Sequence, residues 1–236
     1  MSKKSILLSL AILFVNLNAF GGELDRYDFS WLDPDKEVFV LQNRKFRKNG
    51  KIHFNAGFGK TLSGAFVDAT TIQARAGYFF KEEFGVEFLY AKNSGAENDT
   101  AKSVRNSGSG SGSTPFSRIM DDYTGAMLLW SPFYSKINTF NKIVYMDWIF
   151  GLGFAKITET NNLLELDSNG IDKTLTQKSH TGLMWNVGAK FYFTEMWSTR
   201  LDLTSVNYQA QTNIKNETQK IWYNNYDLIF SIEASF

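Results

Sequence analysis

Few residues in this 236-residue chain have side chains and spacing suited to chemistry. The sequence contains two histidines, His53 and His180, and no cysteine. We therefore expect neither a metal site built from nitrogen and sulfur ligands nor a bound cofactor. A second group consists of charged residues that alternate with apolar residues along the chain. In a strand, these charged residues would lie on the same face as Gly, Ser, Thr and Asn. This predicted charge cluster comprises Arg75, Glu87, Asp147, Lys190, Arg200, Asp202 and Glu233.

Acyl transfer or hydrolysis would require a hydroxyl nucleophile beside a histidine. Ser179 and His180 are adjacent, but neighbouring residues of a strand point to opposite faces, so these two side chains could not share a site. His180 would have to meet another hydroxyl group, such as that of Thr124 or Ser205. We assign no catalytic residue, and lipid-acyl hydrolysis or transfer stays a less favoured alternative.

The stretch Gly59, Lys60 and Thr61 matches the end of a phosphate-binding loop, but Phe54 stands where the first glycine of that motif would fall. The formal net charge of +1 offers no basic surplus for nucleic acid. We therefore expect neither nucleotide nor nucleic-acid binding.

Polar and apolar residues alternate along eight segments, which is the pattern of strands with one apolar face. The predicted strands cover residues 51–60, 71–80, 84–90, 124–130, 143–154, 183–193, 197–203 and 226–236. In the last of them, the apolar face carries Tyr226, Leu228, Phe230, Ile232 and Phe236.

The two faces of these strands differ in a way that favours a membrane barrel. None of the residues assigned to the apolar faces is charged, as expected for lipid contact, where a Lys or Arg at the bilayer midplane costs about 2 to 4 kcal/mol. The opposite faces are sparse in charge, mixed in sign and rich in glycine, as in a narrow filled lumen. We predict an all-β fold, a closed antiparallel transmembrane β-barrel of eight strands. A soluble β-sandwich or lipocalin-like barrel is the alternative.

Connections between the predicted strands alternate between short and long, which indicates periplasmic turns and extracellular loops. An even strand number then places both barrel termini in the periplasm. The longest loop includes the Ser-Gly tract 107–113, which water solvates readily. Within the lumen, strand parity sets Arg75 diagonal to Glu87 and places Glu233 near Lys51 or His53.

The first 50 residues precede the predicted barrel, which spans 51–236. Residues 1–21 resemble a signal peptide, with an apolar run that is too short to span a bilayer and cleavage near Ala19 or Gly21. Residues 22–50 form a periplasmic segment in which Asp33 is positioned to cap a short helix, although an extended strand is equally open. Its basic end includes Arg47 and Lys48. We favour a solvated turn there over a periplasmic plug or a contact with peptidoglycan or a protein.

Three stretches carry a family resemblance: VLQNRKFRKNGKIHFNAGFG at 40–59, LLWSPFYSKI at 128–137 and MDWIFGLGFA at 146–155. They resemble the outer membrane beta-barrel domain family known mainly from myxobacteria and predatory relatives. That resemblance implies a small outer-membrane barrel and brings no assigned activity. The last strand, ending in Phe236, also resembles the C-terminal assembly signal of outer-membrane barrels, which implies the barrel-insertion machinery as a partner during assembly.

Taken together, these patterns favour a small non-enzymatic protein of the bacterial outer membrane with a structural or surface-interaction role. Its expected partners are outer-membrane lipid and an unidentified periplasmic or surface molecule, and a monomer is expected. A narrow channel or hydrophobic-ligand transporter is the alternative. An eight-stranded lumen is just wide enough for side chains to fill, which argues against a water-filled pore.

Overall fold

A computed structural model of the chain describes residues 26–27, 38–39, 44–106, 113–139, 142–168, 171–212 and 219–236. The chain divides into two compact units, Met1–Lys45 and Phe46–Phe236. In the first unit, β1 (Arg26–Tyr27) and β2 (Val38–Phe39) form an antiparallel pair. The predicted signal peptide and the predicted cap at Asp33 lie outside the described residues.

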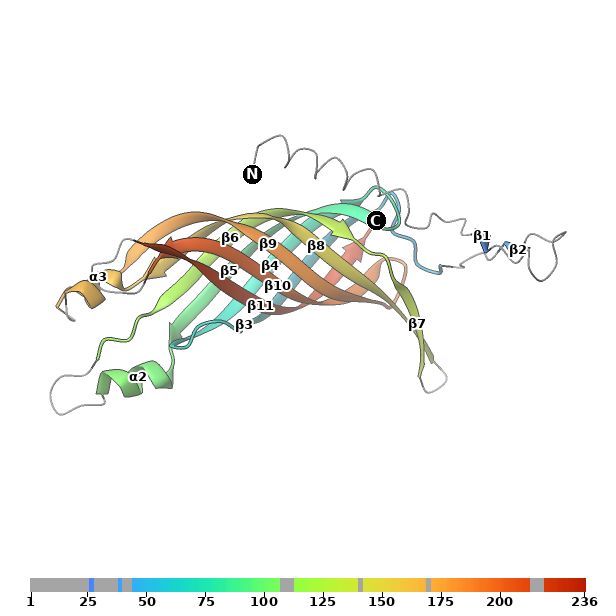
Figure 1. The fold of residues 1–236 in the computed structure, drawn as a ribbon. Helices are drawn as coiled ribbons and strands as arrows, with labels where there is room; N and C mark the ends of the chain where they lie inside the picture. The colour runs from blue at the N-terminus through green and yellow to red at the C-terminus, as the bar shows by residue number, and fades with distance from the viewer. Residues whose placement is uncertain are drawn as a thin grey trace, which may run out of the picture. The chain divides into compact units, whose positions relative to one another are not determined.

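The second unit is a closed antiparallel barrel, which confirms the predicted fold (Figure 1). Its wall consists of β3 (Ile52–Thr61), β4 (Val67–Phe79), β5 (Phe84–Glu97), β6 (Arg118–Trp130), β8 (Lys142–Asn161), β9 (Thr176–Tyr192), β10 (Trp197–Gln211) and β11 (Lys220–Ser235). Each strand pairs with the next along this order, and β11 pairs with β3 to close the ring. At the seam, Ile52 and Phe236 exchange two backbone hydrogen bonds of 3.0 and 2.9 Å.

Alternation along the strands determines which side chains face outward. On β3, Phe54 and Phe58 are exposed while His53 and Asn55 are buried, and the same rhythm continues on the neighbouring strands. The strands span 10 to 20 residues, whereas about 9 to 11 suffice to cross a bilayer. Every strand of the wall is therefore long enough to cross a bilayer, and all except β3 are longer than the crossing requires.

An additional strand, β7 (Tyr134–Thr139), follows β6 and pairs with the first residues of β8, from Tyr134 opposite Asp147 to Thr139 opposite Lys142. The sequence pattern had predicted only a connection here, and that expectation was wrong. Because Trp130 at the end of β6 pairs with Phe150, the first part of β8 extends past β6 and takes β7 as its partner. The resulting hairpin projects from one end of the barrel (Figure 1).

The two ends of the barrel differ in their connections. At one end, here called the short-turn end, lie the turns 80–83 and 193–196, the β7–β8 hairpin and Phe236. At the other, the long-loop end, lie the connections 62–66, 98–117, 162–175 and 212–219, with α2 (Asp99–Asn106) and α3 (Leu163–Asp167) (Figure 1). Residues 107–112 of the Ser-Gly tract lie outside the described ranges. Among the residues that are described, no helix has the length and apolar character needed to cross a membrane.

The lumen is filled by an apolar cluster and a polar network. The apolar cluster includes Leu89, Met127, Leu129, Ile149 and Met184, from β5, β6, β8 and β9, and all of these side chains are buried. The polar network comes mainly from β3, β4, β10 and β11, with further members from β5, β8 and β9.

Candidate functional site

All seven residues of the predicted charge cluster are buried on inward faces of the barrel, each with 3% or less of its surface exposed. Six of them form ion pairs with one another. The seventh, Asp147, pairs with Lys48, which precedes the first strand of the wall. The members are Arg75, Glu87, Asp147, Lys190, Arg200, Asp202 and Glu233.

Glu87 lies at the centre of this network. Its Oε1 accepts a hydrogen bond of 2.8 Å from Arg75, and its Oε2 accepts one of 2.7 Å from Arg200. Arg75 and Glu87 are diagonal in the register, because Arg75 lies opposite Leu89. His53 Nε2 adds a third contact at 3.0 Å. One carboxylate thus contacts basic groups from three other strands.

The His53 contact depends on the backbone of a neighbouring strand. Gly77 lies opposite His53, and a Cβ atom at this position would come within 2.5 Å of the imidazole ring. Glycine therefore leaves the space into which the ring points toward Glu87.

Arg200 connects the centre of the network to the barrel seam. It donates at 2.8 Å to Asp202 Oδ1 and contacts Glu233 Oε2 at 3.4 Å, and Glu233 also pairs with Lys190. Glu233 is diagonal to His53 in the register, since His53 lies opposite Ser235. The ion-pair partners of Glu233 nevertheless lie on β9 and β10 instead of β3.

Neutral side chains complete the central network. Asn186 donates to Asp202 Oδ1 at 2.9 Å and accepts from Thr204, whose hydroxyl also accepts from Arg75 at 2.9 Å. Buried charges are tolerable only when they are paired and hydrogen-bonded. The geometry supports a structural role for these groups, since each charge contacts at least one opposite charge.

The short-turn end contains a cation that sequence analysis missed. Lys48 is buried, pairs with Asp147 and donates to Ser131 Oγ at 2.9 Å. Tyr192 donates to the same carboxylate at 2.6 Å. The predicted cluster held three cations and four anions, and Lys48 supplies the fourth cation. That imbalance was the only sequence signal for its role.

Phe46 enters the same end of the barrel. Its ring stacks on Tyr192 at 4.9 Å and meets the edge of Tyr145 at 5.2 Å, and the Lys48 backbone N–H donates to both oxygens of Glu82 at 3.1 Å. The expected solvated turn is therefore wrong for Lys48, although Lys45 and Arg47 are exposed. We call Phe46–Lys48 the plug segment. It belongs to the barrel unit, five residues before the boundary expected at residue 51.

His180 does not lie beside either of its candidate nucleophiles. It pairs with inward-facing Ile157, and its Nε2 is 3.2 Å from Glu159. Thr124 faces outward and is exposed, while Ser205 lies opposite Trp185 and Tyr226 on its neighbouring strands. Neither hydroxyl shares the inward face of the wall with His180. Among the described residues, no group of three histidine or acidic side chains is placed to hold a metal.

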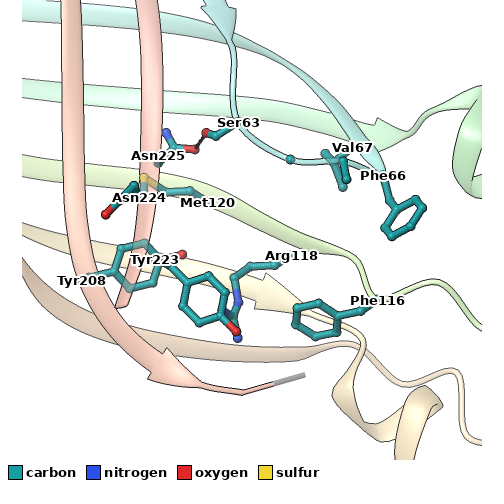
Figure 2. A pocket seen from close by; sticks show the side chains of 12 residues that line it. Ser63, Phe66, Val67, Phe116, Arg118, Met120, Tyr208, Tyr223, Asn224 and Asn225 are labelled. Atoms are coloured by element: carbon teal, nitrogen blue, oxygen red, sulfur yellow. Dashed lines mark hydrogen bonds between the residues drawn. The ribbon is translucent and has the colours of Figure 1, made fainter. Parts of the chain in front are cut away.

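A pocket of about 260 Å³ opens at the long-loop end (Figure 2). Its walls come from the 62–66 connection, from the end of the 98–117 connection and from the adjacent parts of β4, β6, β10 and β11. The lining residues are Ser63, Gly64, Ala65, Phe66, Val67, Phe116, Arg118, Met120, Tyr208, Tyr223, Asn224 and Asn225. None of them was singled out from the sequence, because this pocket forms where loops and strand ends from distant segments meet.

Arg118 is the charged residue in the pocket wall. Its guanidinium carbon lies 3.8 Å from the centre of the Tyr223 ring and 5.0 Å from that of Phe116 (Figure 2). Nη2 donates at 2.7 Å to the carbonyl of Gln211, and Nε is 3.1 Å from Glu159 Oε2. Tyr208 also donates to Glu159 Oε2, at 2.8 Å. The pocket thus combines aromatic walls with one buried cation.

Outside the barrel wall, an ion-pair clasp joins α2 to α3. Arg105 donates to Glu97 at 2.6 and 3.0 Å and to Glu165 at 2.6 and 3.0 Å. The hydrogen bond from Arg105 lowers the pKa of Glu165, and the two carboxylates raise the pKa of Arg105. The clasp holds two long connections together at this end.

The predicted assembly residues lie on the outer face of β11 and at its end. Leu228, Phe230, Ile232 and Phe236 are exposed, whereas Tyr226 is partly covered and meets Trp185 edge to face at 6.2 Å. An exposed apolar row is available to lipid, and its role as an assembly signal stays a prediction.

Solved structures similar to this chain include the N-terminal β-barrel domain of Pseudomonas aeruginosa OprF. The two sequences are 13% identical, the match covers 80% of this chain and 98% of that one, and the TM-score is 0.48. Neisserial surface protein A has 13% identity, coverage of 79% and 96%, and a TM-score of 0.41. AlkL, solved in lipid bilayers, has 16% identity, coverage of 85% and 96%, and a TM-score of 0.36. No curated protein matches the chain.

A family model described as "Outer membrane protein beta-barrel domain" matches residues 41–236. The match covers the whole closed barrel, including the plug segment, and extends over most of the chain. It is a general outer-membrane barrel family, broader than the myxobacterial and predatory group whose motifs the sequence resembles. The chain belongs to the outer membrane protein beta-barrel domain family.

Proposed function

We propose that this protein is a non-conducting outer-membrane barrel that acts in envelope structure or in surface contact through its long-loop end. The observation that carries this proposal is the paired charge network across the middle of the lumen, centred on Glu87, Arg75 and Arg200. Side chains that are fully buried and mutually paired leave no continuous aqueous path, because ions would have to displace them.

Planar-bilayer recording tests this proposal. We expect purified wild-type protein to give no steady conductance steps. A Phe46→Ala/Lys48→Ala variant should also be silent, because it loosens only the plug segment and leaves the central network in place. Steps of porin size from wild type would refute the proposal, and steps from the plug variant alone would make the plug, not the network, the barrier.

The orientation forms part of the proposal: the short-turn end and both barrel termini face the periplasm, and the long loops face outward. An epitope inserted at Ser109 should be detected on intact cells. Detection only after permeabilisation would reverse the orientation. The narrower resemblance to myxobacterial and predatory-bacterial barrels belongs to the same proposal, as does insertion by the barrel-assembly machinery.

A hydrophobic-ligand carrier is the second candidate, and the pocket at the long-loop end favours it over an open channel. Lipid-acyl chemistry is least supported, because His180 contacts Glu159 and Tyr208 instead of a hydroxyl nucleophile. Phospholipid and lipid A profiles should be identical with and without His180→Ala. A difference between those profiles would reopen the enzymatic alternative.

A further inference from the structure

We propose that the pocket at the long-loop end binds a small organic carboxylate with an apolar body, and that Arg118 binds the carboxylate. This inference names a ligand class for the pocket, and it rests on the proposed function only for the side of the membrane that the pocket faces.

The charge is supplied by an arginine with a spare donor. The Arg118 side chain is only 8% exposed, and its Nη1 has no hydrogen-bond partner among the described residues. A buried N–H group without an acceptor is costly, and a charged one more so. Arg118 lines the pocket, so an anion bound there would satisfy this donor once the side chain turns Nη1 toward it.

Glu159 forms an ion pair with Arg118 but leaves one donor of the guanidinium unused. Its Oε2 accepts from Tyr208 and lies near Arg118 Nε, while its Oε1 accepts from Asn161 at 3.1 Å and contacts His180. The carboxylate is therefore shared among four neighbouring groups. Arg118 Nη1 donates no hydrogen bond to it, so one donor of the guanidinium is unused although the atom is covered in this conformation.

The walls suit an apolar body better than a fully polar one. Phe66, Val67, Phe116 and Met120 line the pocket, and the Tyr223 ring lies against the guanidinium (Figure 2). Aromatic stacking fixes the plane of an arginine and presents its edge to a planar carboxylate. Binding sites commonly combine such apolar walls with a few oriented polar groups.

The size limits the ligand. A volume of about 260 Å³ lies just below the range of about 300 to 1,000 Å³ that is usual for ligand pockets, which favours a small ligand such as one ring bearing a carboxylate. Ser63 and Asn225 are hydrogen-bonded to each other at 2.6 Å, so their polar groups are already engaged. These features favour an aromatic or short aliphatic monocarboxylate over a sugar, which would need several free donors and acceptors.

The test uses 4-fluorobenzoate as the probe and 4-fluorobenzamide as its neutral counterpart, with fluorine NMR of the folded full-length barrel in lipid nanodiscs. We expect wild type to bind the benzoate more tightly than the benzamide. Arg118→Met should weaken benzoate binding about tenfold or more, the usual effect of losing a hydrogen bond to a charged group, and leave benzamide binding unchanged.

Matched variants separate binding from folding. Lys156→Met removes the same charge from the exposed outer face near this end and should leave benzoate binding unchanged. Arg118→Met/Glu159→Gln removes both partners of the ion pair, so it avoids an unpaired carboxylate and should show the same loss for benzoate. Heat modifiability of each variant checks that the barrel has formed.

Three results would overturn the proposal: equal binding of benzoate and benzamide by wild type, unchanged benzoate binding in Arg118→Met, or no binding of benzoate at millimolar concentration. Displacement of benzoate by maltose, with no dependence on Arg118, would make the pocket a carbohydrate site and would also overturn it. Steady conductance steps from the wild-type protein would refute the proposed function. They would not alter the preference for benzoate over benzamide, so the failure of one proposal can be told from the failure of the other.

Discussion

Arg200 in the middle of the lumen and Arg118 at its long-loop end are both buried arginines on inward faces, yet their surroundings differ. Arg200 contacts three carboxylates, those of Glu87, Asp202 and Glu233. Arg118 contacts one carboxylate, a backbone carbonyl and two aromatic rings, and it lines a pocket. An arginine surrounded by three carboxylates therefore helps to fill the lumen. An arginine with one carboxylate neighbour keeps a donor that a ligand in the pocket can use.

The largest expected effect comes from breaking the central network. Glu87→Ala leaves a longer contact of 3.7 Å to Asp202 as the remaining ion pair of Arg75, and an uncompensated buried charge costs about 3 to 5 kcal/mol. The temperature at which the heat-modifiable form is lost should fall markedly. Arg75→Met in the same chain should restore much of the loss, because Arg200 keeps its other two carboxylates.

Glu159→Ala is the matched change beside the pocket. Its effect on the same transition should be smaller than that of Glu87→Ala, since Arg118 keeps the Gln211 carbonyl and the Tyr223 ring. Equal effects of the two variants would mean that the middle of the lumen and its long-loop end are equally closed to water.

The plug segment should give an intermediate effect. Lys48→Met removes the ion pair with Asp147 and leaves that buried carboxylate with neutral donors such as the Tyr192 hydroxyl, so we expect a loss of about 3 kcal/mol, the lower end of the range for a broken buried pair. Urea unfolding in lipid measures this loss. Lys48→Met/Asp147→Asn removes both charges and should recover stability, and a double variant as weak as the single one would contradict the importance of the pair.

The clasp between α2 and α3 should depend on pH. The pKa of Glu165 is lowered from 4.5 by the hydrogen bond from Arg105, so its stabilising contribution is fully present above that pH and disappears as the pH falls through the lowered value. Hydrogen-exchange protection of residues 99–106 and 163–167, corrected for intrinsic rates, should fall on acidification below about 4.5. In Arg105→Met this dependence should vanish, while the central network keeps its protection in both proteins.

The smallest effect on stability is expected at the end of the chain. Phe236 is exposed and its backbone, not its ring, closes the seam with Ile52. Phe236→Ser should lower the amount of protein inserted into the outer membrane while leaving the thermal transition of inserted barrels unchanged. Phe230→Ser, on the same face, separates the terminal position from the loss of one apolar side chain. Undiminished insertion of Phe236→Ser would contradict the assembly-signal hypothesis.

The sequence by itself determined the face on which each strand residue lies. Side chains alternate because of local backbone geometry, so the positions of Phe54, Arg75 and Glu87 relative to the wall required no knowledge of distant contacts. The diagonal position of Arg75 and Glu87 also followed, because a short turn fixes the register of the two adjacent strands.

Only the tertiary structure decided which charges meet across the barrel. Glu233 pairs with Lys190 and Arg200, and Lys48 enters from a segment without strand periodicity to pair with Asp147. These contacts, like the pocket around Arg118, depend on the curvature and stagger with which the wall closes, and those are properties of all eight strands together. Local alternation sets inside from outside, whereas closure of the whole wall sets each charged side chain's partner.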